Sequence, residues 1–546
     1  MRKSGYQLRS QILIWALLIT TLGVTPFYSY DPINVFRATA VLFFGLISLG
    51  GLLVNFKSLL SKENRTVLIL SISFLLWIAL ASINSNMGIA ETLFGVTGRN
   101  TGVLTYLSLL SLMLFAVITK NNTSIPNLIL ALLFCGLISA LYGLIQSFGI
   151  DPFEWINPYS PVFGFFGNPN FQASFMGISA TAALSYCLQK RKWNLWRSIW
   201  LSYIPLSLYV VYLSKSQQGY LVFAAGASVV IYLWIKSFDK LSKLKPIYLF
   251  ICFIGITAVL LDILQKSPWQ SVLYKPSVTF RGDFWRTGWQ ITQDNPIFGV
   301  GFDGYRDNYR LYRDQITAER NPSAMVDSAH NVFLDISSGG GLPLLLIYCG
   351  LILLVVIAIA RVIRREKYFN YSFAGISGVW VAYLAQSVIS INQIGLAIWG
   401  WALSGVIIGY EIKTRNIAPS AEVRTPAMER VAIYLSVIIG LVVSLPLLLA
   451  DGQFRSSVKA GDVIKIEQNL DRWPQSVIRM NVAAQIFIDG GFANRALIIS
   501  QKAVKLNPIN FEAWEKIYLN PESDENTKAQ ALAKMRELDP FNPSIK

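Results

Sequence analysis

The sequence is short of charge and of histidine. Only 14% of its 546 residues are charged, and His330 is its single histidine. Soluble domains carry about 25% charged residues. With 53% hydrophobic residues, this composition excludes the soluble globular class and indicates an integral membrane protein.

Cysteine is also scarce. The four cysteines, Cys135, Cys187, Cys252 and Cys349, all lie in apolar runs, without CxxC spacing and without a nearby histidine. This placement excludes a disulfide framework and a zinc site of the usual spacing. We expect the four thiols to pack in the hydrophobic core.

Long apolar runs recur through most of the chain. A membrane-spanning helix needs roughly 20 apolar residues. The sequence predicts about thirteen such helices, at 12–25, 35–54, 66–84, 103–119, 125–149, 171–188, 196–214, 219–235, 246–264, 342–360, 371–391, 393–410 and 431–450. The expected fold class is therefore all-α and polytopic, with a transmembrane domain over 1–450 and a small helical region over 451–546.

The net charge of +16 comes from basic residues that cluster in alternate connections. These residues are Lys57, Lys62, Arg65, Lys120, Lys190, Arg191, Lys192, Arg197, Lys236, Lys240, Lys243, Lys245, Arg361, Arg364, Arg365, Lys367, Lys413, Arg415, Arg424 and Arg430. Cytoplasmic connections are enriched in lysine and arginine. The pattern predicts a cytoplasmic N-terminus and an extracytoplasmic C-terminal region, and it explains the charge without nucleic acid.

The longest polar connection, 265–341, lies outside the cytoplasm in this topology. It carries six arginines among tryptophans, tyrosines and aspartates, namely Arg281, Arg286, Arg306, Arg310, Arg313 and Arg320. Arginine binds phosphate and carboxylate groups through two parallel hydrogen bonds, so the loop is a candidate anion site. Surface ion pairs with Asp283, Asp303, Asp307 and Asp314 are the alternative for each arginine.

His330 lies near the end of this loop, just before a predicted span. A histidine can act as a general base because its pKa lies near neutral pH. A purely structural role is the alternative for His330. The glycines Gly339, Gly340 and Gly341 that follow predict a helix break, and GVGFDG at 299–304 predicts a turn.

The C-terminal region shows a weak internal repeat. Met480 and Trp514, like Pro474 and Pro508, are separated by 34 residues. That spacing resembles tetratricopeptide repeats, which pair helices into binding surfaces. Binding of a protein partner and simple packing against the membrane domain both remain open.

Five motifs occur in the order GRNTG, FGNPNF, SKSQQG, RGDFWRTGWQITQDNPIFGVGFDGYRDNY and SAHNVFLDISSGGGLP. Together they resemble the O-antigen ligase family, across about residues 10–412. The resemblance implies a multi-pass glycosyltransferase of the GT-C type in the bacterial cytoplasmic membrane. It would move a glycan from undecaprenyl diphosphate to an acceptor hydroxyl outside the cytoplasm, with no further cofactor and no metal.

The resemblance also assigns residues. The family's histidine falls on His330 and one of its two key arginines on Arg281. The family's Ser-Arg-Gly turn is Ser216, Gln217, Gln218 and Gly219 here, so the second arginine is absent and Lys215 is the nearest cation.

Charge development in such a transfer suggests a role for each candidate residue. Arg281, with Arg286, Lys215 and Arg99, would bind the departing diphosphate. His330 would deprotonate the acceptor in an inverting attack, or would hydrogen-bond the phosphate instead. Asn331 and Gln217 are candidate substrate-binding residues beside these positions.

Three other kinds of function stay open: another glycan transfer, transport, and an inactive scaffold. A glycan polymerase and a protein O-oligosaccharyltransferase would differ only in the acceptor, which is a lipid, a polysaccharide or a protein. A flippase or exporter would carry the same lipid-linked glycan without cleaving it, but such transporters usually keep ionisable groups at mid-membrane depth, where this sequence has none. An inactive scaffold is the third.

Overall fold

The computed structural model describes residues 2–119, 124–153, 155, 160–189, 192–263, 276–415 and 426–545. All regular secondary structure in these ranges is helical, and the ranges contain no β-strand. Of the features considered above, Lys120, Lys190, Arg191, Arg424 and positions 265–275 of the long loop lie outside the described ranges.

Each of the thirteen predicted spans falls on a helix. These helices are α1 (Arg2–Leu22), α2 (Asn34–Val54), α4 (Arg65–Ile83), α6 (Val103–Ile118), α7 (Ser124–Ser147), α8 (Pro169–Cys187), α9 (Leu195–Leu213), α10 (Gln218–Lys236), α12 (Lys245–Ile263), α17 (Val332–Arg365), α18 (Tyr371–Ile389), α19 (Ile394–Lys413) and α20 (Pro426–Ala460). Eight of them are long and apolar enough to cross a membrane, counted over the described residues. The protein is therefore a polytopic membrane protein, and the number thirteen stays a prediction.

The long helices pack into one bundle through small residues. At Gly45 of α2, an added Cβ would lie 2.2 Å from the Cβ of Ser108 on α6, so only glycine allows this approach. Cys135 and Cys187 are buried in this core, as expected. Cys349 is exposed on α17, so core packing is wrong for this thiol. Its face of α17 is apolar, and in a membrane helix such a face is turned toward lipid.

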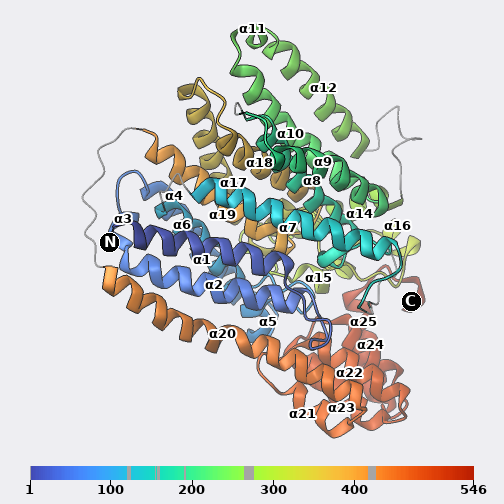
Figure 1. Ribbon diagram of the computed structural model, residues 1–546. Coiled ribbons are helices and arrows are strands. Elements are labelled where there is room, and N and C mark those ends of the chain that lie inside the picture. The colour runs from blue at the N-terminus through green and yellow to red at the C-terminus, as the bar shows by residue number, and fades with distance from the viewer. Residues whose placement is uncertain are drawn as a thin grey trace.

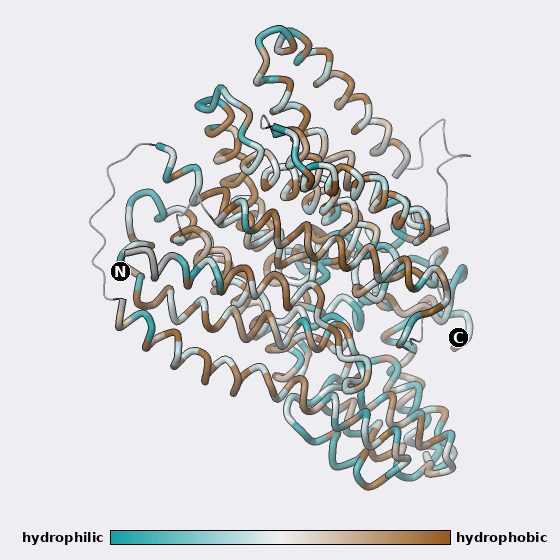
Figure 2. Tube along the Cα trace, in the orientation of Figure 1, coloured by the Kyte–Doolittle hydropathy of each residue, from teal (hydrophilic) through white to brown (hydrophobic). Residues whose placement is uncertain are grey.

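The helices of the long loop, together with α5 and the helices of the tail, gather at one end of the bundle (Figure 1). Those of the membrane domain are α5 (Ile89–Phe94), α14 (Pro276–Asp294), α15 (Tyr305–Tyr312) and α16 (Gln315–Arg320). The tail adds α21 (Val463–Leu470), α22 (Val477–Asp489), α23 (Ala493–Leu506), α24 (Phe511–Leu519) and α25 (Glu525–Leu538). Figure 2 shows hydrophilic residues concentrated in the tail and hydrophobic residues along the middle of the long helices. We call this end of the bundle the loop end.

The remaining short elements are α3 (Phe56–Leu59), α11 (Asp239–Ser242) and the 3₁₀ turns η1 (Gly164–Phe166) and η2 (Pro543–Ile545).

The predicted helix break lies in α17. Gly341 has φ 75° and ψ 177° inside the helix, a conformation that a residue with a Cβ rarely adopts. The 299–304 turn lies against this break, since Val300 and Gly301 donate backbone hydrogen bonds to Ser338 and Gly339. Both sequence predictions, the break and the turn, are confirmed.

The tail begins within a continuous helix. Helix α20 runs through the predicted boundary at residue 450 to Ala460. The hydrophobic core nevertheless divides there: Leu448 packs with the membrane bundle, whereas Phe454 packs with the tail. The helices α22 and α24 begin 34 residues apart and each precedes a second, antiparallel helix, α23 or α25. The assignment of these helix pairs to tetratricopeptide repeats stays a prediction.

Candidate functional site

His330 lies where the long loop meets α17. The side chain of the next residue, Asn331, caps the helix by accepting hydrogen bonds from the backbone N–H groups of Phe333 and Leu334 at 3.0 and 3.3 Å. His330 itself has φ 52°, a left-handed conformation that is uncommon outside glycine. Its ring stacks on Phe284 of α14, with 5.4 Å between centroids. The strained backbone and the stacked ring hold the imidazole in one orientation.

Arg281 is one helical turn before Phe284 on α14, so both side chains lie on the same face of this helix. Its Nη2 atom donates to Oε1 of Gln218 at 3.2 Å. Among the residues that the structure describes, no carboxylate forms an ion pair with Arg281. Burial lowers the pKa of this half-buried guanidinium. A partly desolvated cation without a counter-charge is a strong site for an anion.

The electrostatics around His330 favour a neutral imidazole. Burial, followed by the positive charges of Arg281 and Arg99, lowers its pKa to about 4, whereas Asp327 acts in the opposite direction. At neutral pH the ring is therefore unprotonated and can accept a proton. The His330 ring stacks on Phe284, one helical turn from Arg281. Arg99 faces Asp335, which accepts a hydrogen bond at 2.8 Å from the backbone N–H of Ala329, next to His330, so the three side chains lie in one region.

Arg99 reaches this region from the GRNTG loop. Asp303 fixes the loop by accepting hydrogen bonds from the backbone N–H groups of Val96 and Thr101, at 3.1 and 3.0 Å. The Arg99 guanidinium is 6% exposed and lies 3.9 Å from Asp327 and 3.6 Å from Asp335. These are long contacts, and the Nη1 atom has no hydrogen-bond partner. Arg99 is therefore a second cation of the site, loosely balanced by carboxylates.

The structure thus brings together His330, Arg281 and Arg99 of the predicted site. Arg286 is placed differently, because it is exposed and pairs with Asp283 and, at 3.4 Å, with Asp314. Lys215 and Gln217 are both exposed. The predicted phosphate- and substrate-binding roles of these three residues stay predictions, as does that of Asn331, whose side-chain oxygen caps α17.

Gln218 is a site residue that the sequence reasoning missed. It is buried, and besides accepting from Arg281 it donates through Nε2 to Ser174 of α8 at 2.8 Å. An added Cβ at Gly219 would lie 2.4 Å from the carbonyl oxygen of Ala173, so this turn requires glycine next to Gln218. Alignment on that glycine would have placed Gln218, not Gln217, at the position of the missing arginine.

A metal site is not formed by the described part of the chain: no group of three or more histidine, cysteine, aspartate or glutamate residues is placed to hold an ion there. The carboxylates closest to His330 instead face Arg99. The site consists of two cations, one neutral imidazole and a glutamine amide.

The site thus combines an arginine without a carboxylate partner among the described residues, a neutral histidine and a turn that requires glycine. Residues 202–349 match the O-antigen ligase family model. The matched segment runs from α9 to the first part of α17 and contains Gln218, Arg281 and His330. No curated protein shows a significant match to the chain. The segment from α9 to the first part of α17 is therefore similar to the O-antigen ligase family, and Arg99 and the tail lie outside the match.

Proposed function

We propose that this protein is a membrane glycosyltransferase that moves a glycan from an undecaprenyl diphosphate carrier to an acceptor hydroxyl. One observation carries the proposal: the His330 ring stacks on Phe284, one helical turn from Arg281, an arginine to which the described residues offer no carboxylate partner. A base beside an open anion site is what transfer from a phosphate ester requires.

The reaction follows from these positions. The acceptor oxygen attacks C1 of the sugar from the face opposite the diphosphate, and its proton passes to the free imidazole nitrogen of His330. The bond between C1 and the phosphate oxygen breaks, and its electron pair remains on the diphosphate. Arg281 and Arg99 stabilise this developing charge. The configuration at C1 is inverted, and the low pKa of His330 lets the imidazolium release its proton to solvent afterwards.

The orientation in the membrane is part of the proposal. Basic connections on the cytoplasmic side would place the loop end, with the site and the tail, outside the cytoplasm of a bacterial cell. The lipid-linked donor would then reach the site from the outer leaflet. The acceptor is a lipid, a polysaccharide or a protein hydroxyl.

Glycan transfer in membranes tests the proposal. Wild type, His330→Gln and Arg281→Gln are expressed at matched levels in cells that lack the native protein, with Arg286→Gln as the control from the same helix as Arg281. We expect wild type and the control to consume the lipid-linked donor, while the other two variants accumulate it. Donor consumption by His330→Gln at the wild-type rate would refute the proposal. Movement of intact donor across the membrane without cleavage would favour a transporter.

A further inference from the structure

The tail contacts the long loop through charged side chains of α15. Arg306 pairs with Glu512 at 2.9 Å. Asp307 is buried and accepts hydrogen bonds from the side chains of Asn507 and Asn510 at 2.7 and 2.8 Å. A buried carboxylate persists only where such donors compensate for its lost hydration. The interface therefore depends on specific polar contacts, unlike a loose surface contact.

Asp539 is the centre of this interface. It follows α25, and its side chain is fully buried. The carboxylate accepts from Nη1 of Arg310 at 2.9 Å and from Nη2 of Arg313 at 2.8 Å. The guanidinium of Arg310 also lies over the ring of Phe511, 4.1 Å from its centroid. Two loop arginines thus share one tail carboxylate in a site without water access.

The same two arginines hold the backbone that leads to His330. Arg313 donates to the carbonyl oxygens of Asn321 and Pro322 at 3.0 and 2.9 Å. Arg310 donates to the carbonyl oxygen of Ser323 at 3.0 Å. A continuous chain of hydrogen bonds therefore runs from Asp539 through two guanidinium groups to residues 321–323, in the segment that leads to the candidate base.

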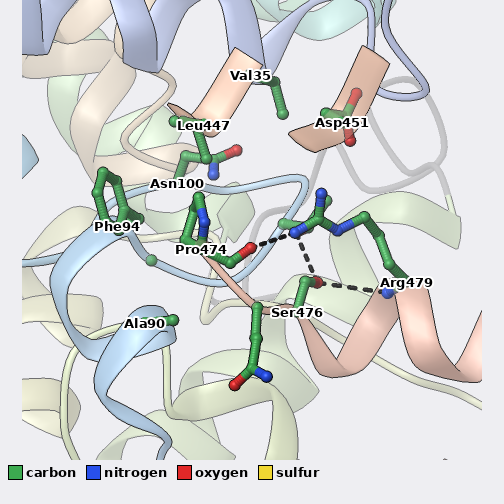
Figure 3. A pocket seen from close by; sticks show the side chains of 12 residues that line it. Val35, Ala90, Phe94, Asn100, Leu447, Asp451, Pro474, Ser476 and Arg479 are labelled. Carbon is green, nitrogen blue, oxygen red and sulfur yellow. Dashed lines mark hydrogen bonds between the residues drawn. The ribbon is translucent and has the colours of Figure 1, made fainter. Parts of the chain in front are cut away.

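A second tail contact reaches the GRNTG loop. The backbone N–H of Val477 donates to Glu91 at 3.0 Å, and Thr97 and Ser476 share a hydrogen bond of 2.8 Å. Figure 3 shows the small pocket at this joint, where Asn100 of the GRNTG loop, Asp451 of α20 and Arg479 of α22 come close together. Its cavity of about 10 Å³ has room for a single water. The joint is thus a structural contact and not a second substrate site.

We propose that the surface of the tail that contacts α15 binds the long loop of the protein itself, and that Asp539 is a positioning residue for His330. This inference rests on the proposed transfer reaction. Two of the segments that lead to the site, the GRNTG loop with Arg99 and the loop before His330, are held by the tail. Misplacement of a catalytic group by an ångström costs on the order of 10²-fold in rate.

The test compares Asp539→Asn with Asp524→Asn in the full chain. Asp524 caps the N-terminus of α25, accepts from Thr527 at 2.6 Å and does not contact the loop. Asparagine caps a helix about as well as aspartate, so Asp524→Asn makes the same chemical change at the other end of α25 and keeps the cap. It is the matched control for the Asp-to-Asn substitution. We expect Asp539→Asn to lower the kcat of transfer by about 10²-fold, with the KM for the donor changed less than about threefold. Asp524→Asn should keep its kcat within about twofold of wild type.

Hydrogen exchange over residues 321–330 is measured on the same samples. Faster exchange in Asp539→Asn, but not in Asp524→Asn, is the expected result. Equal losses of kcat in both variants, or a normal kcat in Asp539→Asn, would overturn the inference. His330→Gln separates the two proposals: if it abolishes transfer and Asp539→Asn does not, only the positioning role fails. If wild type shows no transfer, the proposed function fails, and hydrogen exchange still reports whether Asp539 orders the segment.

Discussion

The arginines of the long loop fall into two groups with opposite environments. Arg310 and Arg313 are buried, and a carboxylate and backbone carbonyls take up most of their donors. Arg281 is half-buried, and among the described residues only a glutamine amide accepts from it. The comparison shows that an arginine is available for substrate when its N–H donors are not already bound to protein groups. Its position in a loop is a weaker guide. Five predictions test this division.

The largest effect is expected for Arg281. Replacement by glutamine removes the fixed charge that would stabilise the departing diphosphate, and loss of such a group costs about 10²–10³-fold in rate. We expect a fall of that size in kcat/KM, measured by donor consumption in membranes. Arg281→Lys keeps the charge but not the planar fork, and it should recover only part of the loss. If Arg281→Gln consumed the donor at the wild-type rate, Arg281 would have a structural role, like Arg310 and Arg313.

Arg313→Ala should act mainly on stability. Removal of one partner from a buried ion pair costs about 3–5 kcal/mol, because the hydrogen-bonding capacity of Asp539 is then left partly unmet. We expect hydrogen exchange in α25 to report a loss of this size in local unfolding free energy. An unchanged exchange rate would mean that the interface is open in solution.

The pH dependence of transfer should follow His330. Burial lowers the pKa of its imidazole to about 4, and only the neutral ring can accept the acceptor proton. Transfer should therefore be nearly independent of pH between about 6 and 8, and kcat/KM should fall as the pH drops through about 4. A decline centred near the ordinary histidine value of about 6.5 would show that the free enzyme lacks this environment.

Gln218→Ala should have a moderate effect. The variant removes the amide that orients Arg281, and a hydrogen bond to a charged group is worth about 1.5–3 kcal/mol. We expect the KM for the lipid-linked donor to rise about tenfold, with a smaller change in kcat. A change confined to protein yield would instead assign Gln218 to the packing of α10 on α8.

The smallest effect is expected for Arg286→Gln. Arg286 is exposed and already paired with Asp283 and Asp314, and surface ion pairs contribute about 0–1 kcal/mol. Transfer rate and thermal stability should stay within experimental scatter of wild type. A loss comparable to that of Arg281→Gln would show that Arg286 changes partner when the donor binds.

Hydropathy and glycine chemistry predicted much of the fold. All thirteen predicted spans coincide with helices, and the break at Gly341 follows from three consecutive glycines. The exposure of Cys349 could not be read from its apolar run, because lipid-facing and buried helix faces are equally apolar.

The sequence could not predict which loop arginines are buried in ion pairs and which are left without a carboxylate. Arg313 and its carboxylate are separated by 226 residues, and the aspartates beside Arg313 in the loop are the wrong partners. The structure places His330, Arg281 and Arg99 in one region, and their predicted roles stay predictions. Gln218 was missed because the turn was compared by its charge and not by its glycine.

The pairing of Arg310 and Arg313 with Asp539 also sets an order in time. A ribosome makes His330 and both arginines long before it makes Asp539, so the nascent chain inserts its membrane helices while these two guanidinium groups still lack their carboxylate. The loop gains its final support only after α25 has been synthesised and, in the proposed orientation, moved across the membrane. Biosynthesis would thus delay the proposed transfer activity until α25 has crossed the membrane.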